Sequence, residues 1–122
     1  MNASSQLGNL AVALVAGPGL SLQFSGQADS RDGQDLFQYL LDAHVEALEK
    51  KVSEVRVDIT NVGYMNSSSL SAFVGWVGEL QKVEAPRRYR IVLLGKSDKR
   101  WQLISLKALA KLAPDQISLS LA

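Results

Sequence analysis

A cluster of three serines is the feature of this sequence best suited to chemistry. Ser67, Ser68 and Ser69 follow Asn66, after an alternating apolar segment and before an amphipathic one. This position predicts that the serines form the first turn of a helix, where unpaired backbone N–H groups and the helix dipole favour an anion. The cluster is therefore a candidate site for a phosphate. Asn and Ser are also preferred helix caps, so a purely structural role stays open.

The composition excludes much catalytic chemistry. The chain has no cysteine and one histidine, which rules out disulfides, thiolate catalysis, cysteine-ligated metals and histidine-rich metal sites. The histidine, His44, lies beside a helical apolar stripe, and no Gly-x-Ser-x-Gly sequence is present, so we do not expect a serine hydrolase. We predict neither enzymatic activity nor a cofactor.

Basic residues are concentrated late in the chain, but they do not predict a nucleic-acid partner. Residues 1–60 hold eight acids and four bases, and residues 61–122 hold four acids and nine bases, for a net charge of +1. Because the two halves interleave in a compact fold, this asymmetry need not form two patches. The segment Gly95-Lys96-Ser97 resembles the end of a phosphate-binding loop, but Arg90 stands where that loop needs glycine.

Alternating and helical apolar patterns predict the secondary structure. The expected order is ββαβαβαβ, an α/β fold with right-handed crossovers and a mixed, mostly parallel sheet of about five strands. The opening hairpin adds an antiparallel edge, and the continuous apolar run 91–94 predicts a strand covered on both faces. The expected strands are residues 10–15, 20–25, 55–60, 89–94 and 117–121.

Apolar residues at helical spacing predict the buried face of each helix. Ser30 or Asp32 is expected to cap the first helix, and the third is expected over residues 98–110. Trp76 lies off the centre of the second apolar stripe, so it is a candidate exposed anchor for a partner, with packing against a neighbouring helix as the alternative. The stripes are Leu36, Phe37, Leu40, Leu41, Val45 and Leu48; then Leu70, Phe73, Val74, Val77 and Leu80; then Trp101, Leu103, Leu106 and Leu109.

Length and hydropathy predict the domain organisation and location. The 122 residues, 47% of them hydrophobic, suit one domain spanning residues 1–122. No apolar run approaches the roughly 18 residues of a membrane span, and the N-terminus lacks the pattern of a signal peptide. We therefore expect a soluble, cytoplasmic protein that does not insert into membranes.

These motifs and their order resemble the STAS domain family, typified by bacterial anti-sigma factor antagonists. In that family a strand leads into a Phe-Met-Asp-Ser-Ser-Gly-Leu-Gly type motif, and here Tyr64-Met65-Asn66-Ser67-Ser68-Ser69-Leu70-Ser71 occupies that place. The upstream segment Gly26-Gln27-Ala28-Asp29 resembles the family's Gly-Glu-Leu-Asp turn. The element order matches over nearly the whole chain. The chain departs from the motif at Asn66, Ser69 and Ser71, which replace an aspartate and two glycines.

The resemblance implies a non-enzymatic regulatory module of bacterial signal transduction and transcription regulation. Its partners would be a serine kinase that is also an anti-sigma factor and a PP2C-type phosphatase, and phosphorylation of Ser67, or alternatively Ser68, would switch between them. A non-phosphorylated scaffold subunit of a transport or signalling complex, and a small-ligand or nucleotide-binding domain, stay open as alternatives. The expected partner-binding residues are Asp29, Gly63, Tyr64, Met65, Asn66, Ser67, Ser68, Ser69, Ser71 and Trp76.

Overall fold

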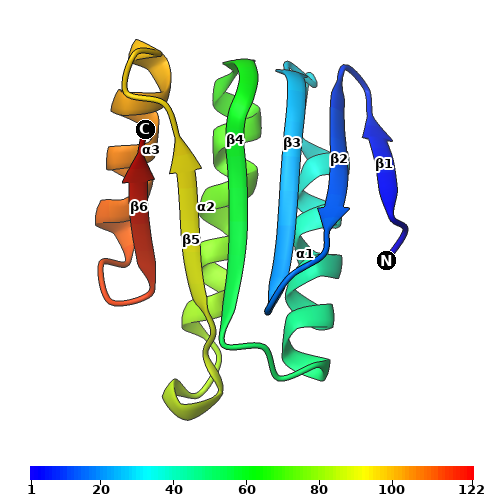
Figure 1. Ribbon diagram of the computed structural model, residues 1–122, viewed down its shortest axis with the longest axis vertical. Coiled ribbons are helices and arrows are strands. Elements are labelled where there is room, and N and C mark those ends of the chain that lie inside the picture. The colour runs from blue at the N-terminus through cyan, green and yellow to red at the C-terminus, as the bar shows by residue number, and fades with distance from the viewer.

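A computed structural model of residues 1–122 shows one six-stranded sheet with three α-helices packed against it (Figure 1). The expected α/β fold with a mixed, mostly parallel sheet is confirmed, and one further strand, β1, precedes the expected hairpin. The elements are β1 (Ser4–Leu7), β2 (Leu10–Val15), β3 (Leu20–Ala28), α1 (Gln34–Glu49), β4 (Glu54–Met65), α2 (Ser67–Gln81), the short 3-10 helix η1 (Ala85–Arg87), β5 (Arg90–Gly95), α3 (Arg100–Leu112) and β6 (Ile117–Leu121).

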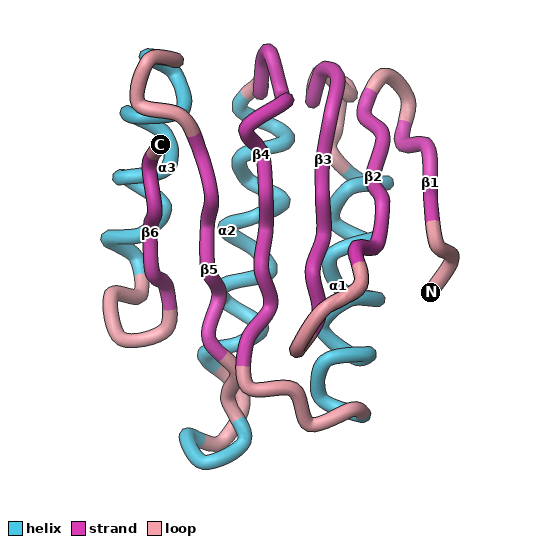
Figure 2. Tube along the Cα trace, in the orientation of Figure 1, coloured by secondary structure: helices cyan, strands magenta, loops and turns pink.

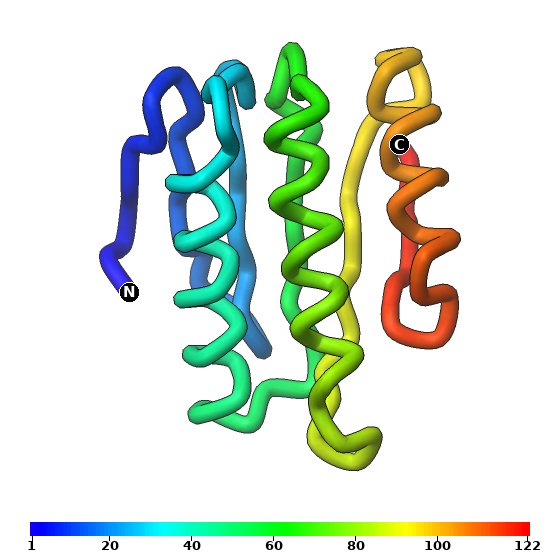
Figure 3. The backbone as a smooth tube through the Cα atoms, turned by 180° about the vertical axis from the view of Figure 1, so that it is seen from behind, coloured from blue at the N-terminus to red at the C-terminus, as the bar shows by residue number.

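The strands lie in the sheet in the same order as in the sequence. β1 and β3 pair antiparallel with β2, whereas β3, β4, β5 and β6 pair in parallel. Each crossover therefore moves one strand further in the same direction, and right-handed crossovers of this kind place their helices on the same face. Figures 2 and 3 show all three helices on one face of the sheet, so the other face is open.

The open face corrects the expectation that β5 is covered on both sides. Ile91 and Leu93 point toward the helices and are 1% exposed. Val92 and Leu94 point the other way and are only half-buried. The continuous apolar run in β5 thus reflects one fully buried side and one side that the helices leave uncovered.

Strand β4 is longer than its alternating pattern predicts. The register between β3 and β4 shifts twice, so the alternation of buried residues breaks after Ile59, and Val62 is the one later residue of the strand that is buried. The strand then continues to Met65. Gly63, Tyr64 and Met65 are consequently the end of a strand that the sequence predicted only over residues 55–60.

The helix stripes differ in detail from the expected ones. In α1 the small residues Ala43 and Ala47 are buried, whereas Val45 is 52% exposed. No side chain caps this helix, because its N-cap is Gly33 in the left-handed region; the Asp32 carboxylate instead accepts a hydrogen bond from the Gln34 N–H at 3.1 Å. Small residues thus shift the buried face in a way that a count of large apolar side chains misses.

A buried glutamine, which sequence reasoning did not find, fastens α3 to β4. The Gln102 side chain is 0% exposed, and its amide donates to the carbonyls of Ile59 at 2.8 Å and Val62 at 3.0 Å. Its Oε1 accepts from the Lys96 N–H at 2.8 Å. Lys99 Nζ adds a hydrogen bond to the Thr60 carbonyl at 2.8 Å. These bonds satisfy backbone groups that the irregular part of β4 leaves without sheet partners.

Candidate functional site

The two segments that carry the candidate site end side by side at one edge of the sheet. In the parallel pair β3–β4, Gln27 lies beside Tyr64 and Ala28 beside Met65. Residues 26–28 therefore belong to a strand, and the chain turns away only at Asp29. The motif 64–71 and the upstream segment 26–29 are thus neighbours in space.

Asn66 joins the two segments and caps α2. Its Oδ1 accepts from the Ser69 N–H at 2.9 Å, and its Nδ2 donates to the Ser30 carbonyl at 2.9 Å. Its backbone N–H donates to the Ala28 carbonyl at 2.9 Å. An aspartate could accept from the helix but could not donate to Ser30, which gives a physical reason for an amide at this position.

The three serine hydroxyls have different environments. Ser69 is 1% exposed, and its hydroxyl donates to the Ala28 carbonyl at 3.1 Å. The Ser68 hydroxyl donates to the Arg31 carbonyl at 2.9 Å. Ser67 is exposed, and its hydroxyl makes no hydrogen bond within the protein. The expectation that Ser69 lies on a partner-binding surface is therefore wrong, because it is buried beneath the loop.

The start of α1 packs against the first turn of α2. Gly33 has a φ of 69°, and a Cβ at this position would lie 2.5 Å from the Ser68 carbonyl oxygen. Only glycine therefore fits here without displacing the backbone of α2. Between the two helix starts lies a groove of about 190 Å³, whose lining includes Asp32, Gln34, Phe37, Ser68, Ser71 and Gly75.

Several of the expected partner-binding residues are exposed around this junction. Tyr64 is 51% exposed, and Asp29, Gly63 and Ser71 are also exposed. Met65 is half-buried and packs against the core. The Asp29 carboxylate accepts from Asn9 Nδ2 at 3.2 Å, which links this edge to the β1–β2 turn.

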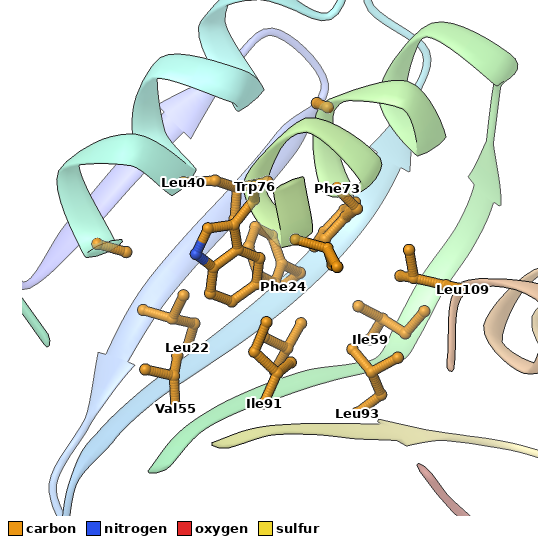
Figure 4. Close-up of a cluster of buried hydrophobic side chains, with 14 of the residues drawn as sticks. Leu22, Phe24, Leu40, Val55, Ile59, Phe73, Trp76, Ile91, Leu93 and Leu109 are labelled. Atoms are coloured by element: carbon orange, nitrogen blue, oxygen red, sulfur yellow. The ribbon is translucent and has the colours of Figure 1, made fainter. Parts of the chain in front are cut away.

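Trp76 is not an exposed anchor, which corrects the expectation from the sequence. It is 1% exposed and lies at the centre of the buried face of α2, among Leu22, Leu40 and Val55 (Figure 4). The expected buried face of α2 included Val74 and left out Trp76, whereas Val74 is 43% exposed. The buried face includes small residues that the apolar count left out; its members are Ser69, Ala72, Phe73, Trp76, Val77 and Leu80.

Trp76 takes part in a hydrogen-bonded network with the single histidine. Its Nε1–H donates to the Tyr89 hydroxyl at 2.7 Å, and that hydroxyl lies 2.7 Å from His44 Nδ1. Because the tyrosine oxygen accepts from Trp76, its own proton is available for a neutral His44. Burial lowers the pKa of His44, opposed by the charge of Glu79, and burial raises the pKa of Tyr89 despite the Trp76 hydrogen bond.

The polar side chains of the site could bind a partner, but they do not form a recognisable nucleophile–base pair or metal site. His44 is bonded to Tyr89 and not to a serine. No group of three or more His, Cys, Asp or Glu side chains is arranged to hold a metal ion. None of the helices combines the length and apolar character that crossing a membrane requires.

The fold and the site geometry together define the class of domain: the chain has a STAS-like fold. Similar solved structures include two anti-sigma factor antagonists and a protein with a fold like theirs. An anti-sigma factor antagonist from Mycobacterium paratuberculosis superposes with a TM-score of 0.61 at 14% identity, covering 90% of this chain and 84% of that one. The unphosphorylated form of the anti-sigma factor antagonist SpoIIAA gives 0.59 at 16% identity, covering 91% and 87%.

A third structure extends the likeness, although the sequences have diverged widely. It is a protein from Shewanella loihica PV-4 with a SpoIIAA-like fold, which gives a TM-score of 0.52 at 14% identity, covering 96% of this chain and 89% of that one. No family model matches the sequence, and no curated protein matches it either. At these identities the likeness establishes the fold.

Proposed function

We propose that this domain is a regulatory binding module that changes protein partners when Ser67 is phosphorylated. The observation that carries the proposal is the difference among the three serines of the cluster: Ser67 alone has an exposed hydroxyl free of hydrogen bonds, whereas Ser68 bonds to the loop before α1 and Ser69 to the end of β3. Ser68, the alternative phosphorylation site, would have to break its bond to Arg31 before modification.

The helix start suits a phosphate on Ser67. Ser67 and Ser68 precede the first hydrogen bond within α2, so their N–H groups face out of the positive end of the helix dipole. A phosphate would add about −1.5 to −2 charges at neutral pH. Because no fold contact depends on the Ser67 hydroxyl, this charge would change the surface without changing the fold.

The partner surface that we propose surrounds Ser67 on the carboxyl edge of the sheet. It comprises Gly63, Tyr64, Ser67, Ser71 and the groove between the starts of α1 and α2. The likeness to anti-sigma factor antagonists supports a protein partner. We propose, as the family resemblance implies, that one partner is a serine kinase acting as an anti-sigma factor and that a PP2C-type phosphatase resets the module. The module would act in the bacterial cytoplasm, in transcription regulation, without catalysis of its own.

The test is the phosphorylation state of the protein in its native host. We would measure the intact mass and map phosphopeptides for the wild-type protein and for Ser67→Ala, with Ser71→Ala as the matched control because it is an exposed serine on the same helix. We expect one phosphate that disappears only in Ser67→Ala. A protein that stays unmodified across growth conditions would contradict the switch and favour a constitutive scaffold, and binding of phosphate or nucleotide would favour a ligand-binding domain.

A further inference from the structure

The largest cavity of the protein lies at the amino edge of the sheet, at the end opposite Ser67. Its volume is about 540 Å³, within the range of sites that hold small molecules. Two connections form it, the turn between α1 and β4 and the segment with η1 between α2 and β5, and both lie at the lower end of Figure 3. We call it the amino-edge cavity. Its lining consists of Leu48, Lys51, Val52, Ser53, Pro86, Arg87 and Arg88.

Three of the seven lining residues are cations, and none is acidic. Lys51 comes from the turn after α1, and Arg87 and Arg88 come from the segment before β5. The nearby acids Glu49 and Glu84 are exposed and do not line the cavity. Only the fold brings these cations together, because they are far apart in the sequence. A cavity lined by charges of one sign attracts ligands of the opposite sign.

The end of α1 does not need the Lys51 side chain. The Lys51 N–H donates to the Leu48 carbonyl at 3.3 Å, and the Val52 N–H donates to the Ala47 carbonyl at 3.1 Å, so the backbone itself caps the helix. Lys51 is the one non-glycine residue with a positive φ, 54°, which glycine would adopt at lower cost. Its ammonium group makes no hydrogen bond or salt bridge within the chain. The lysine thus adds a charge that the helix end does not use.

Arg88 is held in place at the end of α2. Its Nε–H donates to the Val83 carbonyl at 2.7 Å, and its Nη2 donates to the Gln81 carbonyl at 2.9 Å. These bonds leave Nη1 free to meet a ligand. Because the guanidinium is already ordered, it loses little freedom when it binds. The Arg87 side chain is exposed and makes no hydrogen bond or salt bridge within the chain.

Neighbouring lysines outside the cavity have acidic partners, in contrast to the three cations inside it. Lys50 is paired with Glu46 at 3.4 Å, and Lys82 is paired with Glu79 at 3.3 Å. Both of these pairs join residues of one helix and its end. The positive charge of the amino-edge cavity is therefore the part of this edge that lacks compensation within the chain.

The rest of the cavity wall is mainly apolar. Leu48 and Val52 are half-buried and pack against the core, and Pro86 is exposed beside the arginines. A ligand that fits both parts of the wall has an anionic group and a small apolar or ring portion. A phosphate group is well matched to the cationic part, because it carries close to two negative charges and offers several acceptor oxygens to guanidinium and ammonium donors.

We propose that the amino-edge cavity binds a small, soluble phosphomonoester. Its phosphate contacts Lys51, Arg87 and Arg88, and its carbon skeleton lies against Leu48 and Val52. Such a ligand joins the turn after α1 to the segment before β5. The site is at the opposite edge of the sheet from Ser67, so it does not depend on phosphorylation of that serine, and the two proposals can fail separately.

A titration with phenyl phosphate tests the proposal. We would follow the backbone amide resonances of the isotopically labelled protein by NMR. The amides of Lys51, Ser53 and Arg87 should shift, and those of residues 67–71 should not. Phenyl phosphate should bind about tenfold more tightly than inorganic phosphate, because its ring covers apolar surface. Phenol, which lacks the charge, should not bind.

Two variants identify the residues that hold the phosphate. Arg87→Gln and Lys51→Gly should each raise the dissociation constant of phenyl phosphate about tenfold, because each removes a charged donor. Lys51→Gly suits the positive φ, so its thermal midpoint should equal or exceed that of wild type, which separates lost binding from lost folding. Arg100→Gln, an exposed arginine at the start of α3, is the matched control and should bind like wild type. Ser67→Ala should also bind like wild type.

Four outcomes would overturn the proposal. The first is the absence of shifts at the amino edge at millimolar phenyl phosphate, and the second is an equal loss of affinity in Arg100→Gln and Arg87→Gln. The third is binding that Ser67→Ala abolishes, which would locate the anion at the start of α2. The fourth is binding to vesicles of phosphatidylglycerol without binding to phenyl phosphate, which would indicate a membrane surface in place of a soluble ligand.

Discussion

The first turn of α2 and its third turn use polar side chains in opposite ways. In the first turn Asn66 bonds to a backbone carbonyl of the loop before α1 and Ser69 to one at the end of β3, and Ser67 is left facing solvent. In the third turn Trp76 bonds to Tyr89 inside the core. At the helix start, hydrogen bonds to the backbone hold the structure and leave the Ser67 hydroxyl free. In the third turn, Trp76 and Tyr89 satisfy each other inside the core, so neither offers a polar group to a partner.

The substitution of Trp76 is the strongest test of the structural role that we assign to the third turn. Trp76→Ala should lower the free energy of unfolding by about 3–5 kcal/mol, because it creates a cavity and leaves the Tyr89 hydroxyl without its donor. Urea denaturation measures the change. Val74→Ala, on the exposed side of the same helix, is the control and should stay within about 0.5 kcal/mol of wild type. Equal effects of the two substitutions would contradict the burial of Trp76.

The first turn should respond to Asn66 in two steps. Asn66→Asp keeps the acceptor for the Ser69 N–H but loses the donor to Ser30, and should cost about 1–2 kcal/mol in urea denaturation. Asn66→Ala loses both bonds and should cost more. Asn2→Asp, an amide-to-acid change at the exposed N-terminus, should have no measurable effect. An Asn66→Asp protein as stable as wild type would show that the donor contributes nothing.

The network that joins Trp76 in the third turn of α2 to Tyr89 and to His44 of α1 should also make stability depend on pH. Burial lowers the pKa of His44 in the folded protein, so below about pH 6.5, its unfolded value, the unfolded chain binds more protons. The free energy of unfolding should therefore fall as the pH drops from that value toward the folded pKa, and then level off. Comparing wild type with His44→Gln across this range isolates the effect. Glu79→Gln should enlarge the fall, because Glu79 stabilises the imidazolium.

The smallest expected effect is that of Ser67→Ala. Since its hydroxyl makes no bond in the protein, the free energy of unfolding should change by less than about 0.5 kcal/mol. Ser69→Ala should cost about 1–2 kcal/mol, because the Ala28 carbonyl loses a buried donor. Thermal or urea denaturation distinguishes the two. A large loss in Ser67→Ala would mean that this serine is structural, and would remove the main support for a phosphorylation switch.

Much of the architecture could be predicted because large apolar residues mark it clearly. The hairpin of β2 and β3 and the alternation of helices and parallel strands follow from such residues. β1 could not be found in the same way, because Ser4-Ser5-Gln6-Leu7 has one apolar side chain and is held at the sheet edge by pairing with β2. The last part of β4 escaped notice because shifts in register interrupt its alternation.

The position of the candidate site could be predicted from the sequence, but the sequence could not show which of its residues are exposed and which are buried to hold the structure. The serine motif indicated a helix start, and the structure has one there. Which serine is buried depends on the loop from Ala28 to Gly33, which approaches from a distant part of the chain. Trp76 was misplaced because Ser69 and Ala72 contribute to the buried face without being large and apolar. Gln102 gives no apolar signal at all, although it is fully buried.

The order of the strands in the sheet has a consequence for how the chain folds. Each strand pairs with the strand that precedes it in the sequence, so no strand has to wait for a partner made later. The parallel pairs join residues 26 to 37 positions apart, so each crossover with its helix must close a loop before the next strand is added. During synthesis on the ribosome each new strand would find its template already assembled. We therefore expect the sheet to grow strand by strand from the β2–β3 hairpin, with β6 added last.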